Sequence, residues 1–321
     1  MHAPLRIGTR GSQLALWQAR TVATSLESHG VDAELVIIRT SGDRLHEAPL
    51  SEVGGKRLFV KEIEDALLRD EIDVAVHSAK DVPTVLPDGL ELAATLARED
   101  PRDVLVLDAA TPSGDAGSVL ARLRKNPRVG TSSVRRTAQL SALIPGAEFA
   151  PIRGNVDSRL RKLDQGEYDA LVLAAAGMRR LGFGERISAA LSTNQCVPAP
   201  GQGIIALEIR SSDDGCRRAV RIVHDRAAAV ALDAERAVVA ALGGGCQLPL
   251  GALAVLRGQI LDLHAVVCSA DGSRVLRARD AGAADGAMGL GARVAERLAA
   301  DGAADLLNEV REKQGPVEGS Y

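Results

Sequence analysis

The sequence predicts an α/β protein made of two α/β units followed by a small α+β unit. Short apolar runs alternate with amphipathic helical patterns through the first two thirds of the chain, as in α/β folds. A rigid, glycine-bearing crossing, PAPGQG, interrupts that alternation at residues 198–203. The last part instead places two apolar runs before two alanine-rich helical stretches. A length of 321 residues fits two or three domains.

The first unit begins with a short apolar run, Leu5–Gly8, and a helix that Ser12 opens and Gly30 ends. Apolar runs that stand between turn signals are typical of buried strands, and the longer amphipathic run is typical of a helix. The further elements expected here are a buried strand Ala33–Arg39, an amphipathic helix Leu58–Leu68 and a buried strand Ile72–Val76. This order predicts a mostly parallel sheet.

The second unit begins near Pro101 and repeats the alternation. Its expected strands are Val104–Leu107, Val129–Thr131, Phe149–Ile152 and Asp169–Leu173, with helices opening at Ser132-Ser133 and over Val156–Leu163, and a turn at Arg179-Arg180. A strand Ile204–Ile209 and a helix Ala227–Leu242 follow the PAPGQG crossing. The third unit then offers strands Ala252–Leu256 and Leu261–Val267 and helices Met288–Ala300 and Ala303–Lys313.

These elements predict the domain limits. The first domain covers residues 1–99 and is completed by 200–220, the second covers 104–198, and the third covers 225–313. Residues 314–321 are expected to form a flexible tail.

Composition excludes several classes of function. Hydrophobic residues make up 46% of the chain and aromatic residues only 2%, which argues against nucleic-acid binding by base stacking. The net charge of −3 gives no bulk affinity for polyanions, so any anion site has to be local. No signal peptide and no apolar run of membrane-spanning length are visible. Four scattered cysteines without metal-like spacing predict a cytoplasmic protein with reduced thiols, no metal site and no membrane or nucleic-acid partner.

Arginines recur where predicted strands end or helices begin. In open α/β sheets such positions converge on one crevice, and the guanidinium fork suits carboxylates or phosphates. For any one of them a solvated surface charge is the simpler interpretation, but the recurrence favours a polycarboxylate or phosphate site. The set consists of Arg10, Arg135, Arg136, Arg153, Arg159 and Arg180.

Lys80 and Asp81 follow the strand Ile72–Val76 directly. A carboxylate beside a cation at that place suits proton transfer or stabilisation of a developing positive charge, although a plain helix-capping aspartate fits the local pattern equally well. A hydrolase built on His77 and Ser78 is rejected, because neighbours along a strand point to opposite faces. Gly54-Gly55-Lys56 lacks the spacing of a phosphate-binding Walker loop.

Cys246 stands in the glycine-rich loop LGGGCQLPLG. A cysteine on such a loop is a candidate nucleophile, whereas a lone cysteine is more often a small buried apolar residue. No histidine lies within the loop to activate the thiol, which leaves room for a permanent attachment role. Residue patterns alone leave the choice open.

Seven motifs together resemble the porphobilinogen deaminase (hydroxymethylbilane synthase) family. They occur in the family's order up to about Gly251, and they are RIGTRGSQLALWQ, GGKRLFVKEIE, VHSAKDVP, GTSSVRR, RGNVDSRL, PAPGQG and GGGCQLPLG. The resemblance implies two domains similar to type II periplasmic binding proteins, a third small domain, and a dipyrromethane cofactor held on Cys246 by a thioether. One departure is visible: many members carry Lys where this chain has Glu52.

The resemblance also implies the roles of individual residues. Asp81 is the catalytic carboxylate. The implied cofactor contacts are Asp81, Lys80, Ser78, Ser133, Arg135, Arg136, Asp43, Lys56 and Phe59. The implied substrate contacts are Arg10, Ser12, Arg153, Arg159, Arg180 and Gln202.

The implied activity is that of a transferase of tetrapyrrole and heme biosynthesis. Four porphobilinogen molecules are condensed head to tail on the dipyrromethane primer with release of ammonia, and water then frees hydroxymethylbilane. Each ring brings an acetate and a propionate, so a near-neutral protein needs concentrated local cations to hold the growing chain. The enzyme is expected to be a monomer without an obligate protein partner.

Two rival functions remain at this stage. A solute-binding protein would share the architecture of the first two domains, and fold alone does not separate it from an enzyme. The Cys246 loop favours the enzyme. The second rival is another anion-handling transferase in which Cys246 is only structural.

Overall fold

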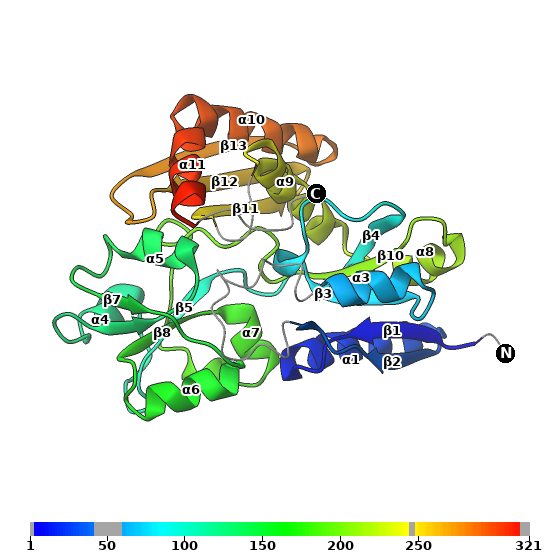
Figure 1. The fold of residues 1–321 in the computed structure, drawn as a ribbon, viewed down its shortest axis with the longest axis horizontal. Helices are drawn as coiled ribbons and strands as arrows, with labels where there is room; N and C mark the ends of the chain where they lie inside the picture. Colours follow the sequence, from blue (N-terminus) through cyan, green and yellow to red (C-terminus); the bar gives the residue numbers. More distant parts are fainter. Residues whose placement is uncertain (1–2, 42–59, 244–247, 315–321) are drawn as a thin grey trace.

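The computed structural model describes residues 3–41, 60–243 and 248–314, which form three lobes, each built around its own sheet (Figure 1). Two lobes carry five-stranded sheets with helices, and the third carries a three-stranded sheet with helices. The predicted fold class, two α/β units and a small α+β unit, is therefore confirmed. Within the described part of the chain, no helix is long and apolar enough to span a membrane.

The first sheet is mixed rather than mostly parallel. Its strands run in the order β2 (Ala33–Ile37), β1 (Leu5–Thr9), β3 (Val74–Ser78), β10 (Ile205–Arg210) and β4 (Leu90–Thr95). β1 is parallel to β2 and β3, but β10 is antiparallel to both of its neighbours. β10 enters the sheet only after the chain has passed through the second lobe, and its direction is what overturns the mostly parallel prediction. The helices of this lobe are α1 (Gln13–Glu27), α3 (Lys61–Leu68) and α8 (Asp214–Val220).

The second sheet is also mixed. Its strands run in the order β7 (Glu148–Ala150), β6 (Arg128–Gly130), β8 (Ala170–Ala174), β5 (Asp103–Val106) and β9 (Ala189–Ala190). β6 is parallel to β7 and β8, whereas β5 is antiparallel to β8 and β9. Its helices are α4 (Ala116–Leu120), α5 (Val134–Leu140), α6 (Val156–Asp164) and α7 (Ala175–Arg180). Arg179 and Arg180, expected in a turn, form the last turn of α7 instead.

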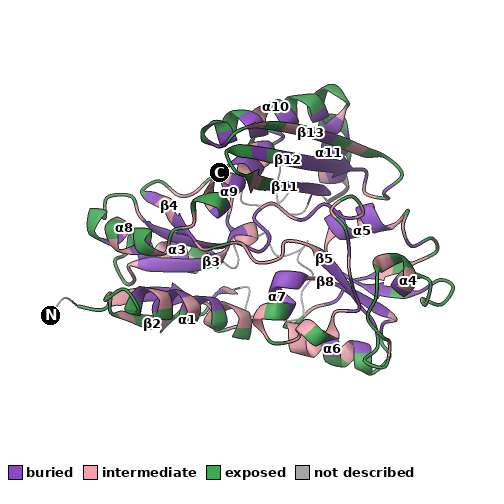
Figure 2. Ribbon diagram, turned by 180° about the vertical axis from the view of Figure 1, so that it is seen from behind, coloured by how far each residue is buried: buried purple, intermediate pink, exposed green. Residues whose placement is uncertain are grey.

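The third lobe is an antiparallel sheet packed against helices. Its strands β11 (Leu250–Arg257), β12 (Ile260–Cys268) and β13 (Val275–Ala283) lie in sequence order, with α9 (Arg226–Ala241), α10 (Ala287–Ala300) and α11 (Ala303–Gln314). β13 was not predicted, because it is an edge strand whose alternate residues, among them Arg277 and Arg279, are exposed. The central strands of the sheets are largely buried, whereas the edge strands β2 and β13 are not, and the helices keep exposed outer faces (Figure 2).

Local signals explain where the elements begin and end. The hydroxyl of Ser12 caps α1 by accepting from the backbone N–H of Ala15, and Gly30 reverses the chain after the helix at φ +81°. α1 buries Val22 and Leu26 against the first sheet. β2, expected to be buried, is an edge strand with Ile37 58% exposed, since no further strand pairs with it among the described residues.

Two chain crossings join the first two lobes, and they are hydrogen-bonded to each other. The N–H of Leu96 donates to Ile205 O (3.0 Å), and the N–H of Glu99 donates to Gly203 O (3.1 Å). Gly203 has φ +89°, and a Cβ there would collide with the carbonyl oxygen of Glu99. Only glycine allows so close an approach in this conformation. The paired crossings therefore place the residues around Gly203 between the lobes.

Candidate functional site

A cavity of about 200 Å³ is lined by residues of all three lobes. Its walls come from the segment after β3, the start of α5, the crossing at 199–202, α9 and the start of β11. Of the described residues that line it, four are basic and one is acidic. The described lining residues are Ala79, Lys80, Asp81, Val82, Thr84, Ser133, Arg135, Arg136, Ala199, Pro200, Gln202, Arg236, Val239, Leu248 and Leu250.

Lys80 and Asp81 reach the cavity because β3 ends just before them. The N–H of Ala79 donates to Ile204 O (2.9 Å), and the chain then forms a 3-10 turn over Ala79–Asp81. Ala79 is buried, which leaves Lys80 and Asp81 on the cavity wall. Desolvation lowers the pKa of Lys80 to about 8; the Arg136 and Arg135 cations act in the same direction, and Asp81 and Asp103 oppose them.

Ser133 places the two arginines of the GTSSVRR motif. Its hydroxyl caps α5 by accepting from the N–H of Arg136 (3.4 Å), so the helix begins at the cavity edge. Arg135 and Arg136 then lie in the first turn, and both side chains are buried while still lining the cavity.

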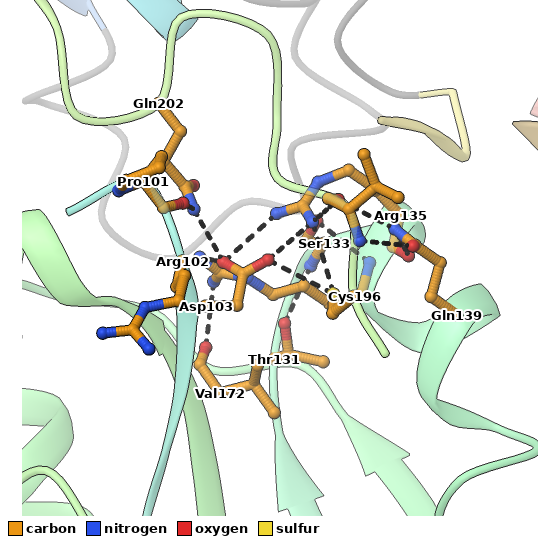
Figure 3. Close-up of polar contacts among 12 residues, drawn as sticks. Pro101, Arg102, Asp103, Thr131, Ser133, Arg135, Gln139, Val172, Cys196 and Gln202 are labelled. Atoms are coloured by element: carbon orange, nitrogen blue, oxygen red, sulfur yellow. Dashed lines mark hydrogen bonds and ion pairs between the residues drawn. The ribbon is translucent and has the colours of Figure 1, made fainter. Parts of the chain in front are cut away.

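Asp103, which sequence reasoning missed, holds both arginines; Figure 3 shows it between Arg135 and Gln202. Its Oδ2 accepts from Arg135 (2.6 Å), and its Oδ1 accepts from the Nε and a terminal nitrogen of Arg136 (3.0 and 2.8 Å). Burial by itself would raise the pKa of Asp103, but the two arginines outweigh it and hold the pKa well below its usual range. The sequence feature that could have revealed Asp103 is an acidic residue at the start of the apolar strand DVLV.

Gln202 connects this ion cluster to Lys80. Its side-chain nitrogen donates to Pro101 O (2.7 Å) and to Oδ1 of Asp103 (2.9 Å), while its Oε1 accepts from Nζ of Lys80 (3.4 Å). Gly201 and Gly203, both at positive φ, flank it and turn its side chain into the space between the lobes. Lys80, Asp81, Ser133, Arg135, Arg136 and Gln202 are thus brought together at one cavity.

Ser78 is not among the residues that line this cavity. Its hydroxyl accepts from Nε2 of Gln18 (2.8 Å) at the end of β3. The neighbouring His77 is buried, and its Nε2 lies 2.9 Å from a carboxylate oxygen of Glu208 on β10. His77 and Ser78 therefore have different partners, in line with the rejected hydrolase.

A second group of predicted residues lies outside the cavity lining, on β1, α1, α6 and α7 or beside them. These are Arg10, Ser12, Arg153, Arg159 and Arg180. Ser12 serves as the α1 cap, and Arg10 and Arg153 are partly exposed. Arg180 donates to Gly203 O (2.6 Å) and stacks over the ring of Trp17 at 5.7 Å, so it links the second lobe to the first.

Neither Arg159 nor Arg180 forms a salt bridge with an acidic residue in the described part of the chain. Arg159 donates from Nε to Gly154 O (2.8 Å). Desolvation lowers the pKa of Arg159 to about 10, with Arg136 acting in the same direction. Desolvation also lowers the pKa of Arg180 to about 10, against the weaker effect of Glu99. A bound carboxylate would offset this cost, and arginine stays protonated throughout.

The loop that carries the candidate nucleophile ends at the cavity. Leu248 and Leu250 line it, while the carbonyl of Gly243 at the other end accepts from Arg311 (2.5 Å). Cys246 itself lies outside the described residues, as do Asp43, Lys56, Phe59 and Glu52. Among the described residues, no group of His, Cys, Asp or Glu is arranged to hold a metal ion.

A second missed residue, Glu235, ties the third lobe to both crossings. It is fully buried on α9 and accepts from Arg98 (2.6 and 3.2 Å) and from the N–H groups of Gly201 (2.6 Å) and Ala254 (2.7 Å). Arg98 belongs to one crossing and Gly201 to the other. No local pattern reveals Glu235, because these partners are distant in the sequence.

Comparison with known proteins gives a consistent family. Residues 5–218 match the family description "Porphobilinogen deaminase, dipyromethane cofactor binding domain", and residues 229–300 match "Porphobilinogen deaminase, C-terminal domain". The chain is 45% identical over 312 residues to the porphobilinogen deaminase of Trichlorobacter lovleyi, covering 97% of each chain. It is 46% identical over 308 residues to that of Syntrophobacter fumaroxidans, covering 95% of this chain and 97% of the relative.

Solved structures give a weaker likeness. The second substrate binding domain of a putative amino acid ABC transporter from Streptococcus pneumoniae aligns with a TM-score of 0.44 and 10% identity. The alignment covers 68% of this chain and 90% of that domain.

Proposed function

The chain belongs to the porphobilinogen deaminase family, and from that premise we propose which of its own residues carry out the reaction. The family resemblance of the motifs, the predicted activity and the dipyrromethane-binding domain are thereby confirmed. The proposal depends above all on one observation: Asp81, Lys80, Arg135 and Arg136 line one cavity together with Leu248, which follows the Cys246 loop.

The side chains around this cavity suit a dipyrromethane. Its two rings carry four carboxylates, and the described lining offers four basic side chains against one acidic. Arginine and lysine are the side chains that bind carboxylates most strongly, and here they are partly desolvated. We propose that Lys80, Ser133, Arg135 and Arg136 hold those carboxylates. When bound, the dipyrromethane supplies the free α-carbon at which the chain grows.

We propose Cys246 as the point of covalent attachment. Leu248, two residues on, lines the cavity. The other three cysteines are buried and free, and burial raises their pKa values, to about 12 for Cys196 and Cys216 and about 11 for Cys268. Because the thiolate is the reactive form, these three are poor nucleophiles. A thioether also resists hydrolysis and thiol exchange better than a thioester, as a permanent anchor requires.

Asp81 is the acidic side chain of the described cavity lining, which supports its catalytic role. We propose that its carboxylate hydrogen-bonds pyrrole N–H groups and stabilises the positive charge that develops as ammonia leaves porphobilinogen. We propose that the same oxygen atoms take up the α-proton released at each condensation. Lys80, the neighbouring residue, is proposed to bind a carboxylate of the primer and to take no part in proton transfer.

Arg10, Ser12, Arg153, Arg159 and Arg180 are proposed to bind the carboxylates of incoming porphobilinogen and of the growing chain. Arg159 and Arg180 support this most directly, because both are desolvated cations that form no salt bridge with the described residues. Gln202 is proposed to align the substrate through its contact with Lys80.

The proposal is tested with purified protein and porphobilinogen. We expect Asp81→Asn to keep its covalent primer but to lose porphobilinogen turnover by roughly a hundred-fold or more, since the charge-stabilising carboxylate is gone. Asp88→Asn, an exposed aspartate seven residues further along, is the matched control and should match the wild type. Near-normal turnover of Asp81→Asn would remove Asp81 from the mechanism.

We further propose that the enzyme acts in the cytoplasm as a monomer. The three described cysteines are free thiols, which fits a reducing compartment. The site is built from residues of one chain, so a second copy is not needed to complete it. Analytical ultracentrifugation should give a mass near that of one 33.5 kDa chain, and a dimer mass at working concentrations would contradict the monomer.

A further inference from the structure

Asp103 is a carboxylate that the structure saturates with donors. It is fully buried at the start of β5, and its two oxygen atoms accept six hydrogen bonds from four residues. Oδ1 accepts from Arg136, from Gln202 and more distantly from Arg135 (3.3 Å), and Oδ2 accepts from Arg135 and from the thiol of Cys196 (3.3 Å). A carboxylate offers about four lone-pair positions, so Asp103 has little left for a ligand.

Asp103 is the acceptor that the two arginines share. Arg135 and Arg136 are adjacent on α5, and adjacent residues of a helix point about 100° apart. Asp103 nevertheless contacts both guanidinium groups. Each guanidinium group also donates to a backbone carbonyl, Arg135 to Val197 O (2.7 Å) and Arg136 to Val172 O (2.9 Å).

Arg135 and Arg136 keep N–H groups that make no hydrogen bond with the described residues. Each guanidinium carries five N–H bonds. Among the described residues, the Nε of Arg135 makes no hydrogen bond, and one N–H on each terminal nitrogen of Arg136 is left over. Because both side chains line the cavity, Asp103 fixes their geometry without consuming their capacity to bind anions.

We propose that Asp103 is a positioning residue of the condensation reaction: it holds Arg135 and Arg136 ready for the carboxylates of the primer and, through Gln202, keeps Lys80 in place. It acts through these side chains and does not touch the reacting rings. This inference rests on the proposed function of the cavity.

The proposal predicts an effect on Lys80 that a purely structural role would lack. Among the described residues, the charged groups that act on Lys80 include Asp81 on its own turn, Asp103 of β5, and Arg135 and Arg136 of α5; Arg236 of α9 lines the same cavity. Of these, Asp103 and Asp81 raise the pKa of Lys80, while both arginines of α5 lower it. Removing the charge of Asp103 therefore lowers the pKa of Lys80 further.

The experiment compares Asp103→Asn with Asp103→Glu and a matched control, Asp100→Asn. Asp100 lies on the same crossing and pairs with Arg102 (2.7 Å) and Arg179 (3.2 Å), none of which line the cavity. The readouts are primer content by intact mass, kcat and KM for porphobilinogen, and the alkaline limb of the kcat/KM profile. Turnover of porphobilinogen by the wild type is measured first, because its absence would contradict the proposed function itself. With an active wild type, the Asp103 variants then test only the role of Asp103.

For Asp103→Asn we expect a loss of kcat/KM of roughly ten-fold or more and an alkaline limb moved to lower pH. Asp103→Glu keeps the charge but displaces the oxygens, so we expect the wild-type limb with a reduced kcat. If Asp103→Asn does not fold, the test depends on Asp103→Glu alone. A kcat of Asp103→Glu equal to that of the wild type overturns the proposal. Wild-type kinetics and an unmoved limb in a folded Asp103→Asn overturn it as well.

Discussion

Among the basic side chains that line the described cavity, Lys80 is the one that loses its proton most readily near neutral pH. Desolvation brings its pKa from 10.5 to about 8, whereas the arginines around it stay charged at any working pH. Its ammonium group is therefore the cation whose loss is measurable in solution. A polycarboxylate ligand would stabilise the protonated form and raise this pKa again.

The kcat/KM for porphobilinogen should fall at alkaline pH, above about 8. This ratio reports on the resting enzyme, which already carries the primer, so the primer carboxylates raise the pKa of Lys80 beyond about 8. Above that raised pKa Lys80 loses its proton and with it one carboxylate-binding charge. Lys80→Arg keeps the charge and should remove this limb. Lys125→Arg, at an exposed site of the second lobe, should leave it as in the wild type. An unchanged limb in Lys80→Arg would show that another group titrates there.

At the scale of elements, local signals predicted most helices and strands but not their partners. Ser12 and Gly30 gave the ends of α1 closely, and the apolar runs gave β1, β5 and β8 to within a few residues. β13 was missed because an edge strand with exposed arginines lacks an apolar run. The antiparallel direction of β10 depends on where the chain returns, which no local pattern contains.

The same division applies to the site. Motifs pointed to Lys80, Asp81, Arg135 and Arg136, because such side chains stand at recognisable strand and helix ends. Asp103 and Glu235 were not predicted. Asp103 meets Gln202 from 99 residues away, and Glu235 meets Arg98 from 137 residues away, so only the folded chain brings them together.

The crossing around Gly203 provides a test at this scale. Gly203→Ala introduces both a left-handed alanine and a collision with Glu99 O, so we expect it to displace Gln202 and to lower both stability and kcat. Gly166→Ala, at φ +77° with open space around its Cβ position, carries only the conformational cost of roughly 1–2 kcal/mol. Urea unfolding of the two variants should show the larger loss in Gly203→Ala. Equal losses would contradict a close approach of the crossings.

At the scale of the whole molecule, the chain is nearly neutral, but positive charge is concentrated at the cavity between the lobes. The net charge is −3, yet four basic residues and one acidic residue face the described cavity between the lobes. Glu235 fixes the third lobe to both crossings, and Arg180 links the first two lobes through Gly203 and Trp17. The cavity walls thus come from all three lobes, while the contacts that hold the lobes together lie beside the cavity.

The central claim is that this chain builds its product on a primer anchored at Cys246. The most direct measurement is the intact mass of the purified, denatured protein, compared with that of Cys246→Ser. We predict that the wild type exceeds its sequence mass by two linked pyrrole units, and that Cys246→Ser shows the bare sequence mass and no porphobilinogen turnover. A wild-type protein that is fully active at its unmodified sequence mass would contradict the claim.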